Sequence, residues 1–258
     1  MRFTSKLSLI LALALAALGG ATSCSSDSVQ NTLAPGTESA VLAAQASAAS
    51  TITIPFNADN FKNGAANVYF PLAPGTSWNY RQETPEGVET NPVEVTNDNK
   101  TILGVKVTVV HDQVYLNGSL AEDTFDWYAS DKEGNVWYFG EDTKTIENGV
   151  VVTTEGSWEA GKNGAQPGII MLAHPQVGVV YQQENSPGIV ADMARVKALN
   201  ETVVTPYGTL AGCLKTQEWT PIEPGSRAFK FYGRGIGIVM EDENKAGGPV
   251  VLTSFSTP

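Results

Sequence analysis

Residues 122–143, EDTFDWYASDKEGNVWYFGEDT, contain the side chains whose types and spacing could do chemistry. Asp123, Asp126, Glu141 and Asp142 are candidate ligands for calcium, which binds carboxylate and carbonyl oxygens. With aromatic rings beside them, Asp126 and Glu141 could instead act as the acid and base of a glycosidase, whose two carboxyl groups lie ~5 to 10 Å apart. The third interpretation is the solvated rim of a β-sheet, which requires no ligand.

A β-hairpin must position these carboxylates. Asp131-Lys-Glu-Gly134 predicts its loop, because glycine readily adopts the positive φ that such loops need. If Ser130 pairs with Asn135, Asp123 faces Asp142, and two opposed carboxylates repel unless a cation lies between them. A shift of one residue removes the repulsion. In the first register the core face is Phe125, Trp127, Ala129, Val136 and Tyr138, and the other face is Thr124, Asp126, Tyr128, Trp137, Phe139 and Glu141.

Other catalytic signatures are weak. The sequence contains only two histidines, His111 and His174, too few for an ordinary zinc site, and we interpret both as structural. The segment 155–159, EGSWE, lacks the glycines of a nucleophile elbow, and 233–237, GRGIG, has no helix after it to bind phosphate. These observations favour a protein that is not an enzyme, with no cofactor except the candidate calcium ion.

The pattern of the remaining chain has a period of two residues. Strict alternation at 105–109 and short β-branched or aromatic runs at 150–154, 179–183, 214–219, 229–232 and 249–254 predict strands. We also interpret 191–199 as a strand. The turn dipeptides between them are Asn117-Gly118, Asn148-Gly149, Pro167-Gly168, Pro187-Gly188 and Pro224-Gly225. The prediction is one all-β domain, residues 54–258, with a single strongly curved antiparallel sheet, a half-barrel, clam or barrel-like fold.

The N-terminal residues predict export. A basic start, an apolar stretch at 7–18 and small residues up to Ser23 are typical of a signal peptide, residues 1–23. Ala-Thr-Ser-Cys24 resembles the lipobox of bacterial lipoproteins, with Ala21 in place of the usual leucine, so Cys24 is the candidate lipid attachment site. Ordinary cleavage after Ser23 is the alternative. Residues 24–53, rich in Ser, Ala and Thr, predict a flexible tether, and Ser25 after the cysteine favours the outer membrane.

The net charge disfavours one class of binding partner, and the cysteine content limits the possible disulfides. The chain has 16 basic and 27 acidic residues, a formal net charge of −11, which disfavours nucleic acid as a partner. If Cys24 is acylated, Cys213 has no disulfide partner and is interpreted as a small buried apolar residue. The fold must then depend on its hydrophobic core.

Several blocks of the sequence resemble those of a family of uncharacterised bacterial secreted proteins and lipoproteins. They are YFPLAPGTSWNY (69–80), EDTFDWYASDKEGNVWYFGEDT (122–143), EGSWEAGKNGAQPGIIML (155–172), TPYGTLAGCLKTQEWTP (205–221) and FYGRGIGIVMED (231–242). The last two blocks also resemble a wider group of periplasmic proteins built as curved antiparallel sheets. The resemblance implies the fold and an extracytoplasmic location, and it implies no activity.

The sequence therefore predicts a cell-envelope lipoprotein that acts as a non-enzymatic binding or accessory module. Its expected partners are the membrane, through the N-terminal lipid, and a small molecule, glycan or protein of unknown identity bound on the concave face. The alternatives are a carboxylate-dependent, glycosidase-like hydrolase and a calcium-stabilised surface domain, both using the 122–143 hairpin.

Overall fold

The computed structural model describes residues 50–243 and 246–258. These residues form one antiparallel sheet and a single 3-10 turn, so the predicted all-β, strongly curved fold is confirmed. The predicted signal peptide, Cys24 and most of the tether lie outside the described residues. Within the described part, no helix is long and apolar enough to span a membrane.

The strands follow one another closely along the chain. The first half contains η1 (Ala58–Phe61), β1 (Ser77–Thr84), β2 (Gly87–Ile102), β3 (Val105–Leu116), β4 (Ser119–Ser130), β5 (Val136–Glu147), β6 (Val150–Thr153) and β7 (Trp158–Glu159). The second half contains β8 (Gln166–Met171), β9 (Val180–Gln182), β10 (Glu184–Asn185), β11 (Met193–Thr205), β12 (Gly208–Trp219), β13 (Ala228–Gly233), β14 (Gly237–Asp242) and β15 (Val250–Ser256).

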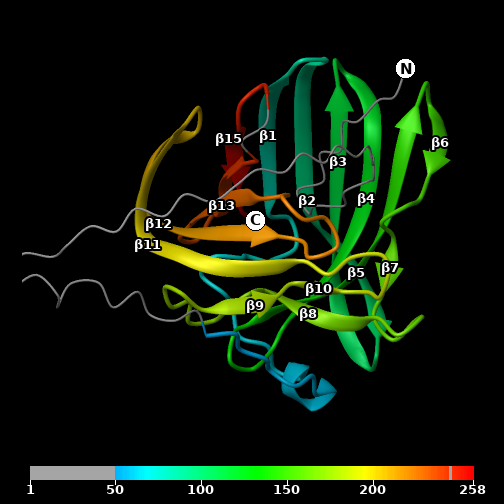
Figure 1. Cartoon of the computed structure of the whole chain (residues 1–258), viewed down its shortest axis with the longest axis vertical. Helices are drawn as coiled ribbons and strands as arrows, with labels where there is room; N and C mark the ends of the chain where they lie inside the picture. Colours follow the sequence, from blue (N-terminus) through cyan, green and yellow to red (C-terminus); the bar gives the residue numbers. More distant parts are fainter. Residues whose placement is uncertain (1–49, 244–245) are drawn as a thin grey trace, which may run out of the picture.

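The order of the strands shows that the sheet curls almost into a closed barrel. The hydrogen-bonded path runs β10-β8-β5-β4-β3-β2-β1-β15-β14-β13-β12-β11-β9, and β6 and β7 pair with β5. β9 and β10 lie at opposite ends of this path, yet only Gln183 separates them in the chain. The two ends of the sheet must therefore meet, and they leave one seam (Figure 1).

The turn chemistry of the sequence accounts for the long hairpins. Asn117-Gly118 and Asn148-Gly149 have positive φ at both residues, as the tight turns of two-residue hairpins require, and they join β3 to β4 and β5 to β6. The predicted turn at Pro167-Gly168 is wrong, because both residues lie in β8. Gly168 is needed there for packing, since a Cβ would stand 2.2 Å from the Gln183 carbonyl oxygen.

The strand predicted at 191–199 is confirmed as the start of β11, although the spacing of its apolar residues also suits a helix. Cys213 in β12 is fully buried and its thiol is free, as expected for a small apolar residue. Burial raises the pKa of this thiol, which keeps it protonated and unreactive.

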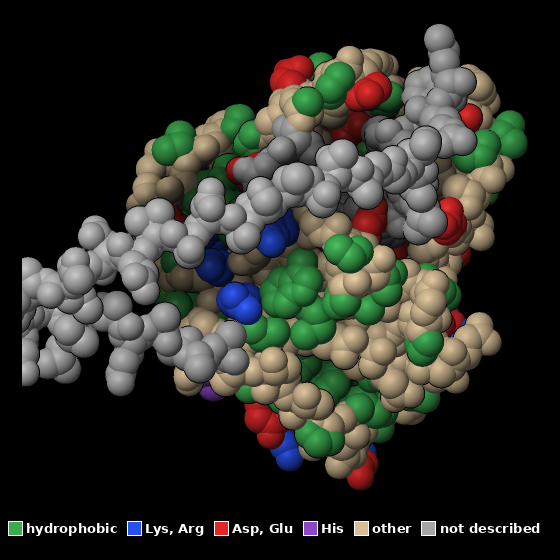
Figure 2. Space-filling model, in the orientation of Figure 1, with side chains coloured by type: hydrophobic (Ala, Val, Ile, Leu, Met, Phe, Trp, Pro, Cys, Tyr) green, Lys and Arg blue, Asp and Glu red, His purple; other side chains and the backbone are tan. Residues whose placement is uncertain are grey.

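The outer surface has an uneven distribution of charge. On the face shown in Figure 2, the Lys and Arg side chains near the centre gather over β11 to β13 beside hydrophobic side chains. Asp and Glu side chains lie mainly toward the margins of this face.

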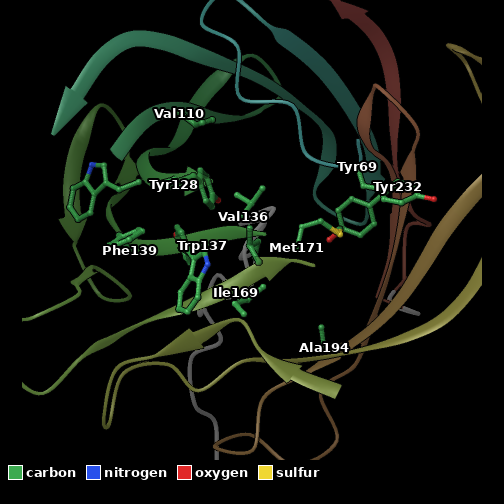
Figure 3. Packing of buried hydrophobic residues seen from close by; sticks show 14 of the residues in the cluster. Tyr69, Val110, Tyr128, Val136, Trp137, Phe139, Ile169, Met171, Ala194 and Tyr232 are labelled. Carbon is green, nitrogen blue, oxygen red and sulfur yellow. The ribbon is translucent and has the colours of Figure 1, made fainter. Parts of the chain in front are cut away.

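The core fills the space that the curved sheet encloses. Val110 and Tyr128 from one wall and Ala194 and Tyr232 from the opposite wall face the same interior (Figure 3). A second cluster lies on the outer side of β5, where Phe56 and Phe61 pack edge-on against Trp137 and Phe139. The segment before β1 thus covers β5 from outside, and β5 is buried on both faces.

Candidate functional site

The register of the β4-β5 hairpin differs from the predicted one. Ser130 pairs with Val136 rather than Asn135, and Asp123 lies opposite Lys144 instead of Asp142. The expected repulsion between two aspartates is therefore wrong. Asp126 and Glu141 are the carboxylates that stand directly opposite each other.

Two local features cause this register, a loop of five residues instead of four and a bulge in β5 at Gly140. β5 has one more residue than β4 between the Tyr128–Tyr138 pair and the Asp126–Glu141 pair, and Gly140 has a φ of +122°. The extra residue turns Glu141 to the same face as Tyr138, whereas simple alternation would place them on opposite faces. The predicted core face is thus wrong in part, because Asp126, Tyr128, Tyr138 and Glu141 share the interior face.

The four candidate calcium ligands are divided between the two faces of the hairpin. Asp123 and Asp142 lie on the outer face. Asp123 Oδ1 lies 2.7 Å from His111 Nε2, and Asp142 Oδ2 forms an ion pair with Lys144 Nζ at 3.1 Å. His111 also stacks on Phe125. Within the described residues, no group of three or more His, Cys, Asp or Glu side chains could hold a metal ion.

The hairpin loop lies where it was predicted but has five residues, Asp131–Asn135, instead of four, and its aspartate is more than a turn residue. The buried Asp131 carboxylate accepts hydrogen bonds from the Asn135 backbone and side chain and from Trp137 Nε1. These bonds fix Trp137 on the outer side of β5, away from Asp126. Trp137 is therefore unavailable as the aromatic platform that the glycosidase interpretation required.

The interior face carries two buried acids in different environments. Tyr138 Oη donates a 2.7 Å hydrogen bond to Asp126 Oδ1, while burial raises the pKa of Asp126 to about 7. Glu141 is 1% exposed, and neither oxygen of its carboxyl group has a hydrogen-bond partner in the described part of the chain. Burial, followed by the charges of Glu184 and Asp126, raises the pKa of Glu141 well above its usual value.

A buried lysine from the opposite wall balances part of this negative charge. Lys230 Nζ lies 3.0 Å from Glu218 and 4.0 Å from Glu241, and all three side chains are at most 6% exposed. Burial alone would lower the pKa of Lys230, but these two carboxylates raise it above its usual value. Thr216, Gln183 and Tyr232 donate further hydrogen bonds to Glu218 Oε1.

Between the two walls lies an interior cavity. Its volume, measured for the centres of water-sized molecules, is about 60 Å³, enough for several waters. Its apolar walls come from the segment before β1 and from both sides of the sheet: Phe70, Pro71, Leu72, Trp78, Val93, Val110, Ile170 and Ile238. The polar side chains of its lining are Asp112, Asp126, Lys230 and the tyrosines 80, 128 and 232.

Asp112 and Asp126 present the same arrangement to this cavity. Asn91 donates to Asp112 Oδ1 at 2.5 Å, and Tyr138 donates to Asp126 Oδ1. In the described residues, the second oxygen of each carboxyl group receives no protein hydrogen bond. Burial, then the charges of Asp126 and Glu122, raises the pKa of Asp112 well above its usual value. Both groups can therefore accept a donor from a ligand.

Hydrogen bonds from two aromatic residues of β1 connect the walls beside the cavity. Trp78 Nε1 donates to the Ile236 carbonyl at 2.6 Å, and Tyr80 Oη donates to the Ile238 carbonyl at 3.0 Å. Phe70 packs edge-on against Tyr128 at the segment that covers the cavity. The walls are thus fixed relative to each other, and Phe70 adds a contact from the segment before β1.

No family model and no curated protein matches the chain. Among solved structures, the chain is similar to the crystal structure of a candidate lipoprotein from Parabacteroides distasonis. The two share 12% identity, the match covers 74% of this chain and 100% of that chain, and the TM-score is 0.40.

The sequence prediction included Asp126 and Glu141 but missed Asp112 and Lys230. A usable signal was present: Lys230 stands between two phenylalanines in AFKFYG, and Asp112 follows the alternating run that starts at Val105. Each occupies an inward position of its strand, where a charged residue requires a partner or a function. The assignment of inward positions depended on bulges that the sequence does not reveal.

Proposed function

We propose that this protein is a cell-envelope lipoprotein whose barrel-like sheet binds a small amphipathic ligand without chemical conversion. The single observation that carries the proposal is the interior cavity, with apolar walls and two buried carboxyl groups that each keep one oxygen free of protein donors. Binding pockets typically combine apolar walls with a few convergent polar groups.

The cavity chemistry favours a ligand with a cationic amine head and an apolar body. Asp112 and Asp126 offer acceptors to the head, and Tyr80, Tyr128 and Tyr232 offer aromatic rings. Lys230 also lines the cavity, where its ammonium group lies 3.0 Å from Glu218 and 4.0 Å from Glu241. Phe70, Leu72 and Trp78 would contact the apolar body.

Ligand binding must then be coupled to protons. Asp126 has a pKa of about 7 and that of Asp112 is also raised, so at neutral pH a large fraction of these groups is protonated. A cation prefers the ionised carboxylate and must displace the proton. Its affinity therefore increases as the pH rises through 7.

The test uses octylamine as the probe and octanol as its neutral counterpart, with binding measured by calorimetry and by the shift in melting temperature. Octylamine should bind and octanol should bind more weakly. Asp112→Asn and Asp126→Asn should each reduce the affinity for octylamine about tenfold or more, as expected for loss of a charge-assisted contact. Asp98→Asn, at an exposed position in β2, is the matched control and should bind as the wild type does.

Equal binding of the amine and the alcohol, or unchanged affinity in both cavity variants, contradicts the proposal.

The glycosidase alternative makes a different prediction. It requires hydrolysis of a glycan by the wild-type protein that is lost in the Asp126→Asn, Glu141→Gln double variant.

The lipid anchor is tested separately in cells. We expect labelled palmitate to be incorporated into the wild-type protein and to be absent from Cys24→Ala, because the acyl chains of a bacterial lipoprotein are attached at this cysteine. Cys213→Ala is the control and should be labelled normally. A wild-type protein that incorporates no label would contradict the anchor but would leave the cavity proposal intact.

A further inference from the structure

We propose that the outer face of β11 to β13 is a membrane-contacting surface that binds the anionic phosphate headgroups of lipids. We call this surface the basic-aromatic face. It consists of three basic residues, Arg195, Lys197 and Lys215, and three aromatic residues, Trp219, Phe229 and Phe231. The inference concerns the opposite side of the sheet from the cavity and does not depend on the proposed ligand.

Strand alternation places the basic side chains outside. In β11, Ala194 and Val196 are buried, so Arg195 points away from the core, and Lys197, in a bulge between Val196 and Ala198, is exposed. The register then sets Gln217 between Arg195 and Phe229, and Lys215 between Ala198 and Phe231. The cations of two neighbouring strands thus lie close together on one surface.

The aromatic rings lie directly beneath these cations. Lys215 Nζ lies 4.5 Å from the ring centre of Phe229 and 4.9 Å from that of Phe231, which is buried beneath it, and Arg195 stacks over Trp219 at 5.7 Å. Figure 2 shows Lys and Arg side chains gathered beside hydrophobic ones over these strands. Long basic side chains above aromatic rings are typical of surfaces at a membrane interface, where the rings lie at headgroup depth.

The basic side chains have no carboxylate partners. Among the described residues, Arg195, Lys197 and Lys215 form no ion pair, whereas Lys62, Lys100, Lys144 and Lys162 each pair with an acid. The acidic residues that border this face are Glu201 in β11 and Asp242, opposite Phe229. A cluster of unpaired cations on a chain with a net charge of −11 can bind an external anion.

The position of the predicted tether favours a membrane as the source of that anion. The described chain begins beside this face: Ile52 N donates to the Val180 carbonyl in β9, and Val180 pairs with Arg195. A lipid anchor at Cys24 would therefore attach the bilayer to the end of the chain that enters the fold beside β11. A cluster of cations over aromatic rings suits a layer of anionic headgroups, which attracts Lys and Arg side chains near its surface.

The test uses the chain from residue 24 with Cys24→Ala, which contains every described residue and no acyl chain. Flotation with vesicles of phosphatidylcholine alone and of phosphatidylcholine mixed equally with phosphatidylglycerol measures binding. We expect binding to the mixed vesicles and much weaker binding to the neutral ones. The triple variant Arg195→Gln, Lys197→Gln, Lys215→Gln should lose on the order of 100-fold in affinity, given the usual contribution of each basic residue near an anionic surface.

The matched control removes three basic residues elsewhere, in Lys62→Gln, Lys106→Gln, Lys132→Gln. All three positions are exposed and the change in net charge is identical, so this variant should bind as the parent does. Circular dichroism melting curves establish that both variants are folded. Equal binding to the two kinds of vesicle, absence of binding to both, or equal losses in the two triple variants would overturn the proposal.

Discussion

At the scale of single residues, Gly140 determines that Glu141 faces the interior of the sheet. Its φ of +122° lies in the region that favours glycine, and a Cβ there would stand 2.1 Å from the Trp158 carbonyl oxygen and 2.9 Å from Glu159 Cα. The missing side chain thus permits two features at once. It allows the bulge that turns Glu141 inward, and it allows β7 to pair closely with β5.

We predict that Gly140→Ala lowers the free energy of unfolding by about 2 to 5 kcal/mol, the sum of backbone strain and forced separation of β7 from β5. Urea denaturation measures this. Gly149→Ala is the control, because Gly149 also has a positive φ but no atom lies within 4 Å of its Cβ position. The prediction fails if both variants lose the same free energy.

At the scale of elements, strand positions could be predicted and the faces of the strands could not. Alternating apolar residues and Asn-Gly dipeptides located the long hairpins, because both signals act over a few neighbouring residues. The assignment of a face requires the register, and the five-residue loop and the extra residue at Gly140 each shift the register by one position. The prediction therefore gave Asp126 and Glu141 as candidates but placed them on the wrong side of the hairpin.

Contacts from distant parts of the chain account for the other differences. The sequence of residues 167–168 is that of a turn, yet the Gln183 backbone requires glycine at 168 within a strand. Trp137 and Phe139 are buried on the outer side of β5 because Phe56 and Phe61 cover them. Such contacts leave no periodic signal near the residues they affect, so local patterns do not reveal them.

At the scale of the whole molecule, the interior holds an unusual number of acids with raised pKa values. Besides Asp112, Asp126 and Glu141, burial raises the pKa of Glu184 and raises that of Asp192 to about 7. The charged and phenolic groups around them are Glu122, Tyr138, Glu218, Lys230 and Glu241. Between the pKa of the unfolded chain and the raised pKa of the folded state, each of these acids is protonated in the folded protein and ionised in the unfolded chain.

We therefore predict that the domain is more stable at pH 5.5 than at pH 8. An acid whose pKa is raised in the folded state contributes fully to the free energy of unfolding when the pH is below its pKa in the unfolded chain, near 4. This contribution is lost as the pH rises to its pKa in the folded state, which is about 7 for Asp126 and Asp192. Each such group lowers the unfolding free energy by up to about 1.4 kcal/mol per pH unit in that window.

Thermal denaturation across this range measures the effect, and Asp126→Asn with Asp192→Asn should flatten the profile. Burial would raise the pKa of Glu159, but Lys100 and Lys162 lower it. Glu159 therefore makes the protein more stable with increasing pH, and it does so only below its usual pKa of about 4.5. It therefore does not obscure the window. A melting temperature that increases from pH 5.5 to pH 8 would refute the prediction.

The seam has a consequence for how a ligand can enter and leave. β8 and β10 form one edge and β9 and β11 the other, so the chain passes from edge to edge at 172–179, again at Gln183, and again at 186–192. Gln183 and Glu184 also donate backbone hydrogen bonds to the Asp192 carbonyl. The chain therefore links the two edges covalently at three places. The edges can separate at the seam only if β9 or β10 leaves the sheet. We therefore expect a ligand of the cavity to enter and leave past Phe70–Leu72, which line it, and not through the seam.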